Sequence, residues 1–156
     1  MAKDVLISLI SIQTTDDDRS ETELMTHAEY SHRNGKDIIS YEDTEATGFE
    51  GSVTTITVDG SRFASVVREG STTSALYLEK DRKHFCQYET PYGSMQIGVF
   101  THKIANTLGL DGKLYMKYTL DLNSSYLSDN EIILSIQDHD ADNRHIRKED
   151  TNGRLN

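Results

Sequence analysis

The sequence has only one cysteine, Cys86, in 156 residues. One thiol cannot form an internal disulfide, so the fold does not depend on an oxidising compartment. Positive charge is also scarce, because 26 Asp and Glu residues against 16 Lys and Arg give a formal charge of −10. Such a chain is repelled by phosphate backbones and by anionic lipids, which argues against nucleic acid and membrane surfaces as partners.

Long hydrophobic runs are missing as well. An apolar run near the N-terminus, Val5–Ile12, is too short to span a bilayer. Lys3 precedes this run, but Asp4 interrupts the basic flank and no small-residue cleavage pattern follows, so a secretory signal is not indicated. We therefore expect a cytoplasmic protein.

Proline is nearly absent, and the single proline lies in the most informative segment. Residues Tyr88–Thr101 read YETPYGSMQIGVFT, in which Pro91-Tyr92-Gly93 separates two stretches rich in aromatic, β-branched and threonine residues. Such residues suit a pleated, half-buried surface, while proline presets the backbone for a turn and glycine completes it. The pattern predicts a β-hairpin.

Turn signals recur along the chain with no convincing helical period between them. Asn34-Gly35 is the pair preferred in a two-residue type I′ hairpin, and Asp59-Gly60 and Asp111-Gly112 repeat the device. Turns at this spacing predict an all-β meander. The expected strands are Val5–Gln13, Glu23–Arg33, Lys36–Glu45, Ser52–Val58, Arg62–Arg68, Thr72–Glu79, His84–Thr90, Ser94–Ile104, Lys113–Leu122 and Tyr126–Gln137.

One of these strands shows how the sheet is expected to be buried. Every second residue is large and apolar, which places Leu114, Met116, Tyr118 and Leu120 on one face and Lys117 on the other. Closing the sheet on itself buries that face and removes exposed edges, so we expect a single antiparallel meander β-barrel of about eight to ten strands. A barrel of this size is either filled by side chains or holds one small ligand, as in calycin and lipocalin-like folds.

The barrel domain is expected to span residues 1–137, and a polar tail follows at 138–156. The tail has only two large apolar residues, Ile146 and Leu155, which is too little to offset the entropy of ordering it. We expect the tail to be disordered or weakly docked.

The tail also contains a false match to a calcium site. Asp138, Asp140, Asp142 and Glu149 fall on acidic positions of a twelve-residue calcium-binding loop. However, Asn143 stands where that loop needs glycine, and no amphipathic helices flank the segment. We expect no metal site here.

Four segments resemble the YwiB-like family of bacterial proteins. They are ISYEDTEATGFEGSVTTITVDG (Ile39–Gly60), REG (Arg68–Gly70), KHFCQYETPYGSMQIGVFT (Lys83–Thr101) and GKLYMKYTLDL (Gly112–Leu122). The resemblance covers roughly residues 3–137. It implies a calycin-type barrel similar in shape to lipocalins and a cytoplasmic setting in mostly Gram-positive bacteria, and it brings no activity and no catalytic residues.

Arg68 is the first candidate for a functional residue. It shares strand parity with Val66, so we expect it to point into the barrel. A buried arginine needs a carboxylate partner, and the candidates are Glu42, Glu50 and Glu89.

The same arginine could bind a ligand, or it could have a structural role alone. With a tyrosine, Tyr88 or Tyr92, at the mouth of the barrel, it could orient an anionic head group. The structural alternative is that these polar groups satisfy each other, as buried charges nearly always do. The candidate ligand-binding set is Arg68, Tyr88, Tyr92, Glu50, Glu89 and Tyr41.

Other chemistries find little support. Two carboxylates serve a glycosidase only when they face each other across a cleft, and a sequence gives no such distance. Side chains two residues apart on a strand, such as His84 and Cys86, lie about 7 Å apart, too far for direct proton transfer. The segment Gly48–Gly51 predicts a turn or bulge rather than a phosphate loop. The sequence shows no zinc-type ligand spacing and no cofactor motif.

Two functional hypotheses from different classes stay open. The first is a non-enzymatic module that binds a small apolar or amphipathic molecule inside the barrel. The second is a protein–protein interaction or scaffold barrel with a filled core and no ligand. An enzyme ranks behind both, because no catalytic motif is found. An open apolar cavity would favour the first hypothesis, and a solid core the second.

Overall fold

The computed structural model describes residues 2–71, 73–90 and 93–137. Within these residues the chain forms ten strands and one short helix. They are β1 (Lys3–Thr14), β2 (Arg19–Arg33), β3 (Lys36–Glu42), β4 (Ser52–Asp59), β5 (Phe63–Gly70), β6 (Ser74–Glu79), β7 (Lys83–Thr90), β8 (Gly93–Thr107), α1 (Leu108–Asp111), β9 (Lys113–Leu122) and β10 (Ser125–Ile136).

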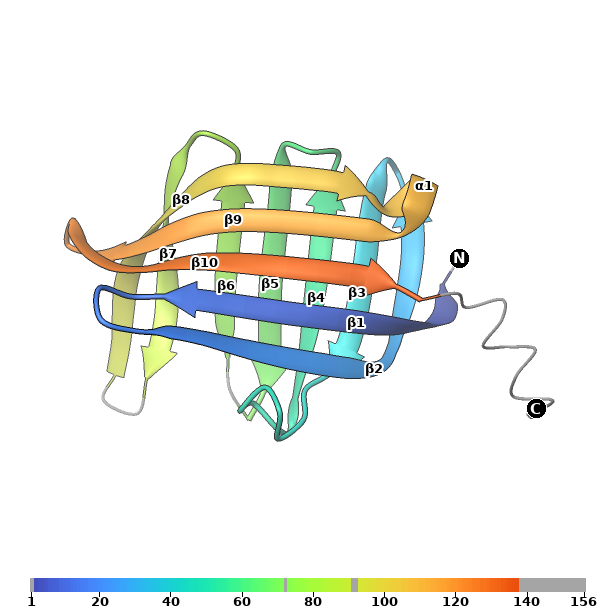
Figure 1. Ribbon diagram of the computed structural model, residues 1–156, viewed down its shortest axis with the longest axis horizontal. Coiled ribbons are helices and arrows are strands. Elements are labelled where there is room, and N and C mark those ends of the chain that lie inside the picture. The colour runs from blue at the N-terminus through green and yellow to red at the C-terminus, as the bar shows by residue number, and fades with distance from the viewer. Residues whose placement is uncertain (1, 72, 91–92, 138–156) are drawn as a thin grey trace.

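The strands form one closed antiparallel barrel in meander order. Each strand pairs with the next one along the chain, and β1 pairs with β10 to close the sheet. In Figure 1, β1, β2, β8, β9 and β10 run across the front of the view, while β3–β7 run up and down behind them. The barrel is therefore flattened into two layers whose strands cross, as in orthogonal sheet packing. The predicted all-β meander barrel is confirmed.

Two seams of the barrel carry few ladder pairs. β2 pairs with β1 over Arg19–Tyr30, opposite Lys3–Thr14, but with β3 only over Glu29–Arg33. Among the described residues, β6 and β7 share one register pair, Ser74 with Tyr88. The barrel is therefore closed, but among the described residues the β2–β3 and β6–β7 strand pairs are hydrogen-bonded over only part of their length.

The predicted turns are confirmed in part. Asn34 and Gly35 both have positive φ, 55° and 78°, as a type I′ turn requires. The turn after Asp59 is longer than expected, because Arg62 N–H donates to the Asp59 carbonyl at 3.3 Å and β5 begins only at Phe63. The short helix α1 precedes Gly112, whose φ of 73° ends it in the left-handed conformation.

Two strand boundaries also differ from the expectation. β2 begins at Arg19, earlier than predicted, because its pairing with β1 runs to the very start of the β1–β2 turn. β3 ends at Glu42, earlier than predicted, because the chain leaves the sheet to form a loop. The hairpin over Tyr88–Thr101 is confirmed by the register of β7 with β8, although Pro91 and Tyr92 lie outside the described residues.

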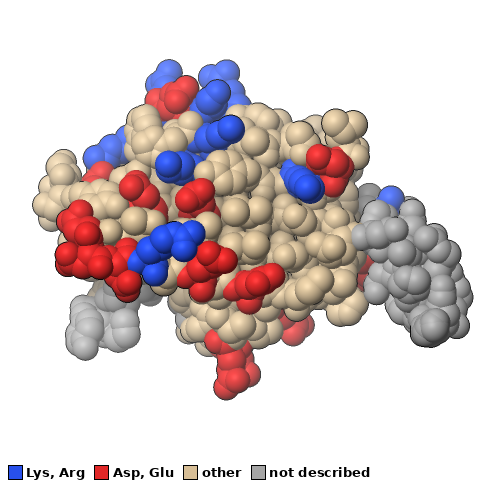
Figure 2. Space-filling view, in the orientation of Figure 1, with Lys and Arg blue, Asp and Glu red and all other residues tan. Residues whose placement is uncertain are grey.

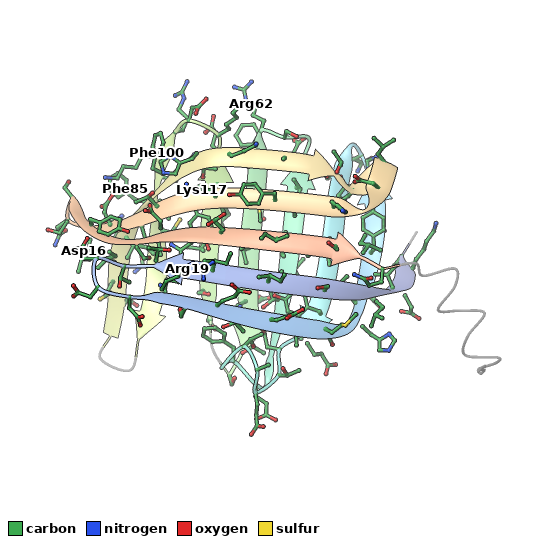
Figure 3. All side chains as sticks on the ribbon, viewed as in Figure 1. Asp16, Arg19, Arg62, Phe85, Phe100 and Lys117 are labelled. Carbon is green, nitrogen blue, oxygen red and sulfur yellow. The ribbon has the colours of Figure 1, made fainter. Side chains whose placement is uncertain are left out.

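The predicted inward face of β9 is confirmed. Leu114, Met116 and Tyr118 are buried, and Leu120 is partly buried against them. Lys117, labelled on β9 in Figure 3, is exposed. The largest fully buried side chains are Ile7, Ile39, Ile56, Leu78, Leu114, Met116 and Leu134, with Val5, Val58 and Val99 beside them.

A buried carboxylate, Asp37, joins several elements near one end of the barrel. Asp37 on β3 accepts hydrogen bonds from Tyr30 at 2.7 Å, from His32 at 2.9 Å and from Asn106 at 3.0 Å. Burial by itself would raise the pKa of Asp37, but the hydrogen bonds from Asn106, His32 and Tyr30 outweigh it and lower that pKa. Because Asn106 also donates to the Gly60 carbonyl at 2.9 Å, this cluster ties β2, β3 and β8 to the β4–β5 turn.

The expected domain boundary at residue 137 stays a prediction. The tail 138–156, including its calcium-like loop, lies outside the described residues. Among the described residues, no helix has the length and apolar character needed to cross a bilayer.

Candidate functional site

The barrel is filled at one end and hollow at the other. Along β1 the inward residues Val5, Ile7 and Leu9 are buried, whereas Ser11 and Gln13, which follow with the same parity, are exposed. Beyond Leu9 the interior opens into a cavity of about 290 Å³. Its apolar wall includes Leu9, Ile56, Val66, Leu76, Leu120 and Ile132, and its polar lining includes Ser11, Gln13, Thr22, Arg68, Ser74 and Asn130.

The loop between β3 and β4 covers one side of this cavity. Asp43 N–H donates to the Ser52 carbonyl at 2.8 Å and so closes the loop at its base. Gly48 and Gly51 have positive φ of 84° and 93°, which confirms the predicted turn in this segment. The loop thereby presents Thr47 and Phe49 to the cavity.

Arg68 enters the cavity from β5, as predicted, and its guanidinium is held on two sides. Its Nε lies 3.3 Å from the Asp43 carboxylate and 3.0 Å from the Thr54 hydroxyl oxygen. The guanidinium carbon lies 3.8 Å from the centre of the Phe49 ring, a close cation–π contact. The ion pair is well shielded, because the exposed fraction is 16% for the Arg68 side chain and 0% for Asp43.

Asp43 pairs with Arg68, so the predictions of Glu42 and Glu50 were wrong, whereas the side chain of Glu89 lies outside the described part. Glu42 is exposed because it has the outward parity on β3, and Glu50 is exposed in the loop. Asp43 is the next inward position after Tyr41 and follows directly on the last residue of β3. Its carboxylate also accepts hydrogen bonds from Thr54 at 2.6 Å and from Thr47 at 3.1 Å.

Tyr41 completes the cluster. Tyr41, Thr54 and Arg68 stand opposite one another in the registers of three neighbouring strands, so they form one row across the barrel wall. Burial raises the pKa of Tyr41 to about 12, and the nearby Asp43 carboxylate adds to the increase. The hydroxyl therefore stays protonated at neutral pH and is available as a hydrogen-bond donor.

The terminal N–H groups of the Arg68 guanidinium form no hydrogen bond to Asp43 or Thr54. Within the described part of the chain, the hydrogen bonds of Arg68 to Asp43 and Thr54 come from Nε alone. Its two terminal nitrogens carry four further N–H groups. Tyr41 lies close enough to interact with Arg68, and no other described residue accepts a hydrogen bond from the terminal N–H groups.

The structure brings together only part of the predicted site. Arg68 and Tyr41 line the cavity together, whereas exposed Glu50 is not among the lining residues, and its backbone carbonyl accepts a hydrogen bond from Ser71 at 2.7 Å. The backbone of β7 places Tyr88 opposite Met95, but the side chains of Tyr88 and Glu89 lie outside the described part. Tyr92 lies outside the described residues altogether.

Cys86 and His84 interact with different partners. Cys86 is buried, and its sulfur accepts a hydrogen bond from Tyr77 N–H at 3.3 Å. Burial raises the pKa of the Cys86 thiol, which opposes thiolate chemistry. His84 Nε2 lies 2.9 Å from a Glu79 carboxylate oxygen instead.

Comparisons with known proteins agree with the barrel fold. The family model described as "Domain of unknown function (DUF1934)" matches residues 7–134. The crystal structure of the ywiB protein from Bacillus subtilis is similar, with a TM-score of 0.67 and 16% sequence identity over 88% of this chain and 94% of that chain. No curated protein matches the chain. At this identity the structural likeness establishes the fold and not an activity.

Proposed function

The chain belongs to the DUF1934 family of domains of unknown function, and we propose that its barrel is a non-enzymatic module that binds one small amphipathic molecule. The observation that supports this most is the cavity of about 290 Å³ next to Arg68. Its volume equals that of about ten water molecules. A single small ligand fits such a space, and a filled scaffold barrel would not contain it.

The lining favours an amphipathic ligand over a purely apolar one. One side of the cavity is built from leucine, isoleucine and valine side chains, while Arg68 and Tyr41 stand on another side. An apolar body can bury surface on the first side at a gain of about 25 cal/mol per Å². A polar head can accept hydrogen bonds from the unused N–H groups of the guanidinium.

The charges around the cavity limit which head groups the site can bind. Asp43 already compensates the charge of Arg68. Exposed carboxylates lie at this end of the barrel as well, Asp16 and Glu45 in loops and Glu69 near the end of β5. A head group that accepts hydrogen bonds and carries no more than one negative charge therefore suits the site better than a phosphate. An ammonium head does not suit it, because it cannot accept a hydrogen bond.

A matched series of ligands tests this proposal. Eight-carbon chains ending in an amide, a carboxylate or an ammonium group are added to the purified protein, and the thermal midpoint is measured. A ligand that binds the folded state alone stabilises it by about 2.7 kcal/mol at 100 times its dissociation constant. We expect the amide and the carboxylate to raise the midpoint and the ammonium compound to leave it unchanged.

Two neighbouring residues of β5 provide the control. Val66 lines the cavity, whereas Val67 has the opposite strand parity and faces outward. Val66→Phe should fill the cavity and abolish the ligand-dependent shift, while Val67→Phe should keep it. If no compound in the series raises the midpoint of the wild-type protein, or if both variants respond equally, the proposal is wrong.

A further inference from the structure

The first two thirds of β2 form a free strand edge within the described part of the chain. β2 pairs with β1 from Arg19 to Tyr30, but its pairing with β3 covers only Glu29–Arg33. Residues 19–28 thus have a ladder partner on one side only. At about 3.4 Å per residue this edge extends over roughly 30 Å, long enough for a full strand of a partner.

The backbone along this edge has no other partner in the described part of the chain. No backbone hydrogen bond to a loop or turn involves residues 20–28. In an antiparallel ladder, alternate residues direct their N–H and C=O groups away from the paired strand. About half of the backbone groups of the segment are therefore open to a new strand.

A groove beside the edge leaves room for such a strand. It has a volume of about 500 Å³ and lies where β3 turns away from β2, between Thr26–Glu29 on one side and Ser40–Glu42 on the other. Val53, with 43% of its surface exposed, lines the groove, and Met25, with 60% exposed, directly precedes the lining residue Thr26 on β2. The groove can therefore take both a backbone and an apolar side chain.

The acidic residues around the edge favour a partner strand with basic side chains. Asp4 on β1 and Glu29 on β2 are direct cross-strand partners, and like charges opposite each other are unfavourable. Asp4, Glu29 and Glu42 all line the groove, and Glu23 lies further along the same edge. Among the described residues, none of these four carboxylates forms an ion pair, whereas Glu21 pairs with Arg19 at 3.4 Å. Figure 2 shows red acidic side chains gathered over β2 and the β1–β2 turn.

We propose that the free edge of β2, residues 19–28, binds an extended, basic segment of a partner protein by strand addition. Main-chain hydrogen bonds to the edge supply affinity, and lysine or arginine side chains relieve the repulsion among the carboxylates. A second copy of this chain suits the edge poorly, because the glutamates of two β2 strands would face each other. The inference does not depend on a small molecule in the cavity.

A labelled ten-residue peptide of alternating lysine and valine serves as the probe, with binding to the full chain followed by fluorescence anisotropy. We expect saturable binding that weakens with salt, and no binding of the peptide in which glutamate replaces lysine. Two further peptides carry backbone N-methyl groups at either the odd or the even residues. Because an added strand bonds along one side only, one N-methylated peptide should lose binding and the other should keep it.

Variants that reverse the charge of glutamates on β2 test whether the peptide binds at this edge. The double variant Glu23→Lys with Glu29→Lys should weaken binding by about tenfold or more, equivalent to about 1.4 kcal/mol. The matched control, Asp59→Lys with Asp111→Lys, changes the net charge equally at the filled end of the barrel and should bind like the wild type. The proposal is overturned if the lysine peptide does not bind, if the two N-methylated peptides behave alike, or if both double variants bind equally. It is also overturned if sedimentation shows a dimer that the peptide dissociates.

Discussion

Replacing Arg68 by methionine removes the cation that faces the fully buried carboxylate of Asp43. Breaking a buried ion pair by removing one partner costs about 3–5 kcal/mol, because an uncompensated charge is left behind. Here the carboxylate keeps two hydroxyl donors, Thr54 and Thr47, and the arginine is not completely buried. We therefore expect a loss at the lower end of that range, about 3 kcal/mol.

Urea denaturation measures this loss through the transition midpoint, provided that the slope of the transition does not change. The double variant Arg68→Met with Asp43→Asn removes both charges and should lose less than the sum of the two single variants, with a coupling of about 1–3 kcal/mol. Arg62→Met is the matched control, because Arg62 is exposed and its guanidinium lies over the Phe63 ring. A loss below about 0.5 kcal/mol for Arg68→Met, the range of surface changes, would refute the buried ion pair.

Three more predictions concern the scaffold. Met116→Ala should cost about 2–5 kcal/mol in urea denaturation because it opens a cavity in the filled end, while Lys117→Ala should stay within about 0.5 kcal/mol. Asp37→Asn should cost about 1.5–3 kcal/mol at neutral pH. Since the folded-state pKa of Asp37 is lowered, its contribution is present above the unfolded pKa and is lost as the pH falls through the folded pKa, so the two unfolding curves should converge in acid. Gly70→Ala should lower the thermal midpoint, because a Cβ there would lie 2.4 Å from the Gly51 carbonyl oxygen at a φ of 133°; an unchanged midpoint would contradict the close approach.

The fold could be predicted from local signals. The Asn34-Gly35 pair fixes a hairpin by its backbone geometry alone, and the alternation around Met116 fixes which face is buried. The helix α1 could not be predicted, because a single turn of four residues leaves no periodic pattern.

Which residues meet in the site depends on the register of β4 with β5. The sequence predicts this register less reliably than it predicts the strands. A two-residue turn at Asp59-Gly60 would pair Val58 with Ser61 and therefore Arg68 with Gly51. The observed longer turn pairs Arg68 with Thr54 instead. The inward direction of Arg68 was predictable from parity, but its neighbours were not, because they depend on this one turn.

The partner Asp43 was missed for a different reason. It lies in the loop after β3, where strand parity no longer fixes the direction of a side chain. The stacking of Phe49 on Arg68 likewise results from the path of the loop. A signal existed for Asp43 alone, because it continues the inward parity of Tyr41 while Glu42 has the outward parity, but that parity is not binding beyond the end of β3.

An NMR titration of the Arg68 guanidinium signals tests the central claim most directly. The claim is that the terminal N–H groups of Arg68 hold the polar head of a small molecule in the cavity. With the eight-carbon amide as ligand, the account predicts saturable shifts of the Arg68 side-chain signals, with no shift of the Arg62 signals at the other end of the barrel. Arg68 signals that stay unchanged at ligand concentrations that saturate binding would contradict it, as would equal shifts at both arginines.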